Sequence, residues 1–146
     1  MKDNRWDIPA GRQYNFANDL KFGHLGEKVT KDFLTSLAEG SFEVKTDRYR
    51  NGRMVVEMQQ NPRDTGWKDS GLLVTKAKWW VYIYALDGSL VVVSVERLKR
   101  FITAISGEMK MKTFAPMSTN PTKGFLLMPE DVMDMLINPD YDQVED

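Results

Sequence analysis

The chain has 146 residues, of which 42% are apolar and 28% charged, and its formal net charge is −1. It contains no cysteine and a single histidine, His24, so disulfides, thiol nucleophiles, thiolate metal sites and zinc sites built on several histidines are excluded. No apolar run approaches 18 residues and no secretory leader pattern is visible, so we expect a cytoplasmic globular protein without a membrane span, folded as one domain over residues 1–139.

The first predicted elements are an irregular arm over residues 1–22 and an amphipathic helix over residues 24–39. Pro9 and Gly11 interrupt any periodicity in the arm. In the following segment apolar residues recur every fourth position, which is the spacing of one helix face. They are Leu25, Val29, Phe33 and Leu37. Gly40 is then suited to end the helix in a left-handed conformation.

Residues 42–48 and 53–59 alternate apolar and polar side chains, which predicts two half-buried strands joined at Asn51-Gly52. A two-residue turn would place Asp47 and Glu57 on opposite faces. A three-residue loop over residues 50–52, with Gly52 left-handed, places both on one face and all even-numbered apolar residues on the other. We therefore predict an antiparallel hairpin of this second kind. One face would carry Glu43, Lys45, Asp47, Glu57 and Gln59, with Lys45 opposite Glu57.

The rest of the chain alternates buried strands with helices. A loop over 61–69 precedes a short helix over 70–78, a strand over 79–85 and, after a turn at Asp87-Gly88, a strand over 90–95. Trp79 and Trp80 could stack on bases, but this apolar run favours a place in the core. Ser94 would cap a helix that ends at Gly107.

A loop over 109–123 then leads to a strand over 124–128. Pro129 would begin a final helix that Asn138-Pro139 ends, and we expect the acidic tail over 140–146 to be disordered. This order of elements predicts an α/β fold with a mixed central sheet flanked by helices.

Charge is distributed unevenly. Four of the acidic residues lie in the last seven positions, so the remainder carries a net +3; they are Asp140, Asp142, Glu145 and Asp146. Basic residues gather near the predicted hairpin tip and again over residues 97–112. A basic surface beside carboxylates suits a polyanionic substrate, although single surface lysines and arginines are more often merely solvated.

Three acidic positions follow one another along the chain: Glu27 in the first predicted helix, then Asp47, then Glu57 in Glu57-Met58-Gln59. Their order resembles that of the restriction-endonuclease-like nucleases, the PD-(D/E)XK superfamily, and in particular small phage-type and Holliday-junction-resolvase-like members. The resemblance covers roughly residues 23–85. The segment 70–83 also resembles the helix-then-strand continuation of such proteins. The chain departs from the family at Gln59, where the usual residue is lysine.

The resemblance implies a restriction-endonuclease-like core and an Mg²⁺ site, with Mn²⁺ as a substitute. Asp47, Glu57 and the backbone carbonyl of Met58 would be its ligands, and Glu27 would hold a second ion or act through bound water. Gln59 brings no charge, so Lys45 is the candidate cation. Arg48, Arg50, Arg53 and Lys76 would contact DNA phosphates.

We therefore expect a phage-type, metal-dependent deoxyribonuclease acting on branched or flapped DNA. Resolvase-like relatives also imply a homodimer. The alternatives are a nuclease-fold protein that has lost turnover and binds DNA or a protein partner, and an interaction module unrelated to nucleases. Without the resemblance, a Lys45–Glu57 ion pair on a solvated face would be the simpler interpretation.

Overall fold

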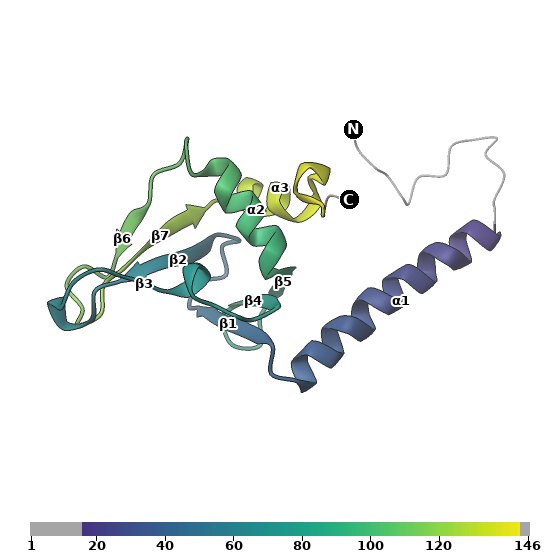
Figure 1. Ribbon diagram of the computed structural model, residues 1–146, viewed down its shortest axis with the longest axis horizontal. Helices are drawn as coiled ribbons and strands as arrows, with labels where there is room; N and C mark the ends of the chain where they lie inside the picture. The colour runs from purple at the N-terminus through teal and green to yellow at the C-terminus, as the bar shows by residue number, and fades with distance from the viewer. Residues whose placement is uncertain (1–15, 144–146) are drawn as a thin grey trace. The chain divides into compact units, whose positions relative to one another are not determined.

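The computed structural model describes residues 16–143. The chain divides into two compact units, of which the first ends at Thr35 and the second begins at Ser36. Each unit is described by itself. Nearly all of helix α1 (Phe16–Ala38) belongs to the first unit (Figure 1). The predicted irregular arm is wrong for residues 16–22, because the breakers Pro9 and Gly11 precede them and the helix itself contains no proline. Residues 1–15 of that arm lie outside the described residues.

The end of α1 follows the prediction. Gly40 adopts a φ of 73°, and its N–H donates to the carbonyl of Leu37 at 3.0 Å. The N–H of Ser41 donates to the carbonyl of Ser36 at 2.8 Å. These bonds satisfy the last carbonyls of the helix and confirm the glycine stop.

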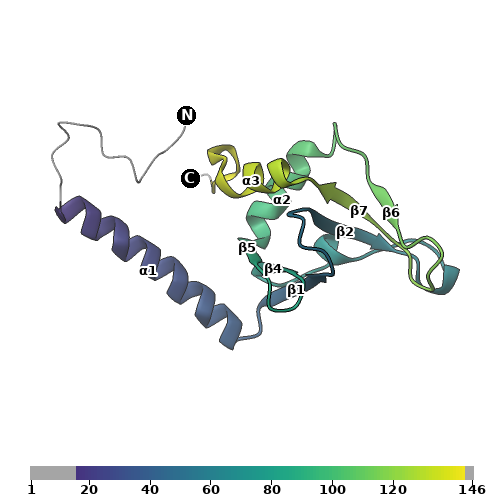
Figure 2. The same ribbon diagram turned by 180° about the vertical axis from the view of Figure 1, so that it is seen from behind.

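The second unit is built on two sheets (Figures 1 and 2). A mixed three-stranded sheet has the order β1 (Phe42–Asp47), β4 (Trp79–Tyr84) and β5 (Leu90–Ser94). An antiparallel four-stranded sheet has the order β3 (Lys68–Asp69), β2 (Met54–Gln60), β7 (Thr122–Leu127) and β6 (Lys112–Phe114). The strand β6 lies in a segment predicted to be a loop.

The predicted hairpin is wrong. Both strands form close to their predicted bounds, but β1 pairs in parallel with β4, and β2 pairs in antiparallel with β3 and β7. The turn itself is as expected: Gly52 has a φ of 76°, and the side chain of Asn51 accepts a bond from the N–H of Arg53 at 3.0 Å. A suitable turn does not ensure pairing, because the partner of a strand is set by which faces can be buried together: β1 lies beside the apolar strand β4, and β2 lies beside β7.

The helices of this unit are α2 (Val95–Ile105) and α3 (Pro129–Ile137). The hydroxyl of Ser94 accepts a bond from the N–H of Arg97 at 3.1 Å and caps α2, as predicted. α2 packs against β4, β5 and α3, and α3 also packs against β7. The predicted helix over 70–78 is reduced to a 3₁₀ turn, η2 (Gly71–Leu73), and two further turns are η1 (Pro62–Asp64) and η3 (Pro139–Tyr141).

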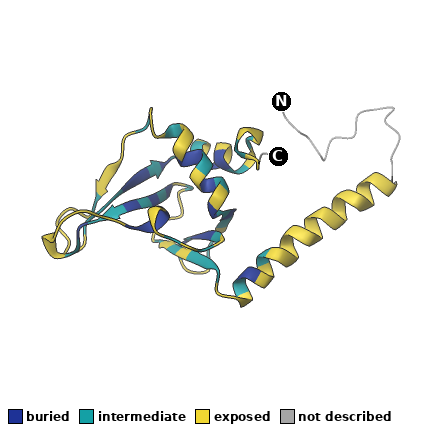
Figure 3. Ribbon diagram, in the orientation of Figure 1, coloured by how far each residue is buried: buried dark blue, intermediate teal, exposed yellow. Residues whose placement is uncertain are grey.

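One core lies between the sheets and these two helices (Figure 3). Trp80 is fully buried within it, which confirms the core interpretation of that tryptophan. The same core takes one face of β2 and of β7 together with the apolar stripe of α2. Among the described helices none is both long and apolar enough to cross a membrane.

Candidate active site

The charged side chains of β1 face the same side of the sheet as the core aromatics. The parallel register sets Lys45 beside Tyr82 and Asp47 beside Tyr84. Val44 is 44% exposed on the opposite side. The predicted parity is therefore wrong for β1. Because β1 is an edge strand, its inward-facing charges still reach solvent around the edge of the sheet.

The hydroxyl of Tyr82 connects Asp47 to strand β2. It donates to Asp47 Oδ2 at 2.6 Å and accepts from the backbone N–H of Val55 at 3.3 Å. The other carboxylate oxygen of Asp47 accepts from the N–H of Tyr49 at 2.8 Å. Burial raises the pKa of Tyr82 well above its ordinary value of 10.0, and the bond to Asp47 raises it further. The hydroxyl thus stays protonated and holds the Asp47 side chain beside β2.

Tyr84 adds an unsatisfied group to the same neighbourhood. Its ring packs edge-on against Tyr82, with centroids 5.2 Å apart. It is 5% exposed, and its hydroxyl has no hydrogen-bond partner among the residues described. Burial raises its pKa and the negative charge of Asp47 raises it further. A buried hydroxyl without a partner is costly, so this position suits a water or ligand oxygen.

Glu57 lies in β2 opposite Gly124 and is half-buried. The turn η2 packs closely against the backbone of Glu57: a Cβ on Gly71 would come within 2.2 Å of the Glu57 carbonyl oxygen. Gly71 also has a φ of 52°, so glycine is required here on both counts. The next residue, Met58, is buried, and its carbonyl accepts a bond from the N–H of Ser70 at 2.8 Å. This carbonyl, a predicted metal ligand, is therefore already engaged.

Gln59, which stands where the family has lysine, and Lys45, the candidate cation, both have other partners. Lys45 Nζ lies 3.2 Å from Glu43 Oε1 and 5.7 Å from the ring centre of Trp80. A bulge interrupts β2 between Glu57 and Gln59, so the two residues no longer follow simple alternation. Gln59 donates through Nε2 to Asp69 Oδ1 at 3.2 Å. The predicted contact of Lys45 with Glu57 is not formed.

No group of three acidic, histidine or cysteine side chains within residues 16–143 is arranged to hold a metal ion. Within that range, the predicted ligands Asp47 and Glu57 are thus not joined by a third such side chain. Glu27 is exposed on α1, in the other compact unit, and its partnership with these two carboxylates stays a prediction.

The four predicted phosphate-binding residues, Arg48, Arg50, Arg53 and Lys76, are all exposed. Among the residues that the structure describes, Arg50 alone of these four finds a side-chain partner, through a long bond of 3.5 Å to Ser89 Oγ. The basic residues of α2 behave differently. The guanidinium of Arg97 donates to the carbonyls of Met135 and Asn138 and to Asp142, and that of Arg100 donates to the carbonyl of Tyr141. The predicted basic surface over 97–112 is thus reduced, because these two arginines hold the C-terminal segment.

Sequence reasoning missed Tyr82. The available signal was the alternation of Trp80, Tyr82 and Tyr84 along one face of a buried strand. A tyrosine hydroxyl on a buried face needs a polar partner, and the carboxylates nearby in the chain are natural acceptors. Its partner could not be identified without the parallel pairing of β1 and β4.

The chain matches no protein-family model, no curated protein and no solved structure in comparisons with known proteins.

Proposed function

We propose that this chain is an Mg²⁺-dependent nuclease that hydrolyses phosphodiester bonds in DNA, with Asp47 and Glu57 as its carboxylate pair. The observation that carries the proposal is the Tyr82 hydroxyl, which bonds both Asp47 and the Val55 N–H. Residues 55 and 57 lie one side-chain repeat apart on β2, about 7 Å along the strand. Asp47 is therefore held close to the strand that carries Glu57.

The donor chemistry fits a hard divalent cation. Mg²⁺ commonly takes one or two protein carboxylates and completes its shell with water and phosphate oxygens. Each oxygen of Asp47 accepts one hydrogen bond and keeps a lone pair for a further partner. When bound, Mg²⁺ would neutralise charge on the phosphate and make water nucleophilic near neutral pH.

The remaining residues would orient the substrate and supply positive charge. Tyr82 fixes the direction of the Asp47 carboxylate. Gln59 brings no charge, so Lys45, two residues before Asp47 on the same face of β1 and 30% exposed in its side chain, would supply the positive charge. Arg48, Arg50 and Arg53 follow directly from β1 in the connection to β2, and would contact phosphates without reading sequence.

The test combines cleavage with metal binding. A panel of single-stranded, duplex, flapped and branched DNA is incubated with Mg²⁺, Mn²⁺ or a chelator. Asp47→Asn and Glu57→Gln should abolish cleavage and lower Mn²⁺ affinity in calorimetry at least about tenfold, because each removes a negative ligand of similar shape. Glu43→Gln, whose carboxylate pairs with Lys45, is the matched control and should leave Mn²⁺ affinity unchanged. Equal affinity in all four proteins would refute the proposal.

A second function, a nuclease-fold protein that binds DNA or a protein partner without turnover, is favoured by a different observation. Lys45 is paired with Glu43, the Gln59 amide with Asp69, and the Met58 carbonyl with Ser70. Each group that would complete the site thus has a structural partner. Mn²⁺ binding by wild type without cleavage of any DNA in the panel would select this function.

A further inference from the structure

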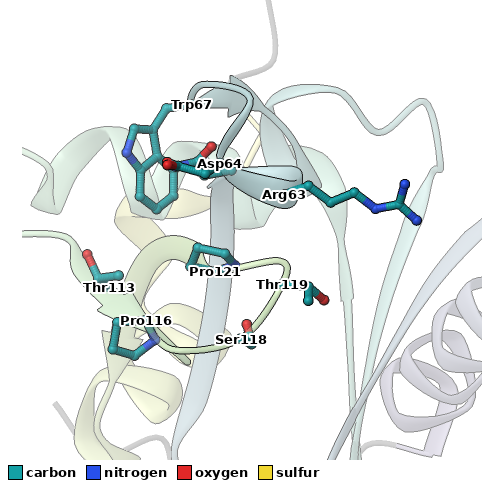
Figure 4. A pocket seen from close by; sticks show the side chains of 9 residues that line it. Arg63, Asp64, Trp67, Thr113, Pro116, Ser118, Thr119 and Pro121 are labelled. Atoms are coloured by element: carbon teal, nitrogen blue, oxygen red, sulfur yellow. The ribbon is translucent and has the colours of Figure 1, made fainter.

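A hollow of about 540 Å³ lies at the end of the four-stranded sheet where β2 stops and β7 begins (Figure 4). Its walls come from two loops: residues 61–67 after β2, and the connection between β6 and β7. Figure 4 shows Trp67 and Asp64 on one wall and Pro116, Ser118 and Pro121 on the other, with Arg63 extending away from Trp67. None of the functions discussed above uses these residues.

The two loops are fixed to each other by their backbones. The N–H of Arg63 donates to the carbonyl of Thr119 at 2.6 Å, and the N–H of Asn61 donates to the carbonyl of Pro121 at 2.9 Å. The buried side chain of Asn61 also accepts from the N–H of Gly66 at 2.8 Å and donates to Asp64 at 3.3 Å. The walls of the hollow are therefore held in place before any ligand binds.

The backbone here is also strained. Arg63 and Asp64 have φ values of 51° and 57°, and Ala115, in the opposite loop, has a φ of 48°. Each non-glycine residue in this region costs about 1 kcal/mol or more, and such residues concentrate at ligand sites. The three positions flank the hollow on both sides, which supports a binding role for it.

The chemistry of the walls separates an aromatic end from a cationic end. Trp67 is 37% exposed, and Lys123 Nζ lies 4.1 Å from its ring centre, so the indole is anchored and polarised. In the part of the chain that the structure describes, the guanidinium of Arg63 forms no hydrogen bond or ion pair. Ser118 and Thr119 add hydroxyls at the rim.

Asp64 limits the class of ligand. An isolated anion would be repelled by this carboxylate, which lies in the same wall as Trp67. A nucleotide keeps its base apart from its phosphate, so its base can lie against Trp67 and Asp64 while its phosphate reaches Arg63. A base has a free face for such stacking only where the strand is unpaired.

We propose that this hollow binds an unpaired nucleotide of a DNA strand, with the base on Trp67 and the phosphate on Arg63. This inference rests on the proposed function, because the nuclease proposal is what identifies the bound strand as DNA. Asn61 follows Glu57 by four residues, about 13 Å of strand. A DNA strand bound in the hollow could therefore extend along β2 toward Glu57, which favours flapped or branched substrates.

The test measures fluorescence anisotropy of a labelled single-stranded oligothymidylate and of a duplex hairpin, with chelator present to prevent cleavage. Trp67→Ala should weaken single-strand binding about tenfold or more, and Trp67→Phe should restore most of it, because stacking needs only an aromatic face. Arg63→Gln should weaken single-strand binding and reduce its logarithmic salt dependence by about 0.7. Lys99→Ala, an equal loss of charge at an exposed position of α2, is the control and should change neither.

Unchanged single-strand affinity in Trp67→Ala would overturn the inference. If Trp67→Ala does not fold, wild-type protein is photocross-linked to an oligonucleotide containing 5-iododeoxyuridine: attachment at Trp67 supports the site, and attachment elsewhere overturns it. The cleavage panel keeps the two proposals distinguishable. If Trp67→Ala weakens single-strand binding but wild type cuts no DNA in the panel, only the nuclease proposal is refuted. If wild type cuts DNA but Trp67→Ala binds single strands as well as wild type does, only the nucleotide site is refuted.

Discussion

Replacing Tyr82 by phenylalanine tests the link between the two strands that carry the candidate site. The change keeps the ring and its edge-on contact with Tyr84, so it removes only the hydroxyl. Asp47 loses a bond of 2.6 Å, and the Val55 N–H loses a bond of 3.3 Å. A hydrogen bond to a charged group contributes about 1.5–3 kcal/mol, and the longer neutral bond adds less than about 1 kcal/mol. We expect the free energy of unfolding to fall by about 2–3 kcal/mol at pH 7.

The same residue predicts an alkaline effect. The pKa of Tyr82 is raised above 10.0 in the folded protein by burial and by the bond to Asp47. Above the unfolded pKa of about 10, the unfolded chain releases this proton while the folded protein keeps it. The contribution is therefore complete below pH 10 and declines as pH rises, by up to about 1.4 kcal/mol per pH unit. Tyr82→Phe lacks this decline, so the stability difference from wild type should narrow above pH 10.

Urea denaturation at pH 7 and at pH 11 measures both effects. Tyr49→Phe is the matched control: Tyr49 is 68% exposed, and it bonds Asp47 through its backbone N–H, which the change leaves in place. A Tyr82→Phe protein within about 0.5 kcal/mol of wild type, the ordinary scatter of surface substitutions, would refute the reasoning. So would a stability difference that stays constant between the two pH values.

Three further predictions concern backbone space, the C-terminal segment and turnover. Gly71→Ala should lower the free energy of unfolding by about 2–4 kcal/mol, because its Cβ would clash with the β2 backbone at positive φ, whereas Gly107→Ala, with open space around it, should be neutral in the same denaturation assay. Arg97→Met removes the three hydrogen bonds that hold the C-terminal segment and should cost about 3 kcal/mol in thermal unfolding, against no loss for Lys99→Met. Gln59→Lys adds the lysine that the resembled family carries. If wild type binds metal but does not cut DNA, this change should create cleavage, and if wild type is already a nuclease, its activity should stay similar or fall. A Gln59→Lys protein that cuts no DNA in the panel in either case would contradict the proposed role of a cation in the site.

The local features of this fold could be predicted from the sequence because their causes are local. The glycine stop at Gly40, the cap at Ser94 and the proline start at Pro129 each depend on a few neighbouring residues, and all are present. The strands 42–47 and 54–60 likewise follow from alternation. Even the left-handed Gly52 in the turn between them is as expected.

The pairing of these strands was decided only by tertiary structure. Asn51-Gly52 favours a hairpin, yet β1 pairs with β4, more than thirty residues later in the chain, and β2 pairs with β7 near its end. Strand pairing depends on which apolar faces can be buried together, and that depends on the whole chain.

The candidate site shows the same division. Asp47 and Glu57 could be selected from residue type and spacing, but their relation could not. Tyr82 belongs to a strand that alternation assigns simply to the core, and its hydroxyl becomes the bridge between Asp47 and β2 only because β4 lies in parallel beside β1. The sequence alone determined which carboxylates were available, and the non-local packing of β4 decided how Asp47 is held, because a buried hydroxyl must bond whatever polar groups the fold brings to it.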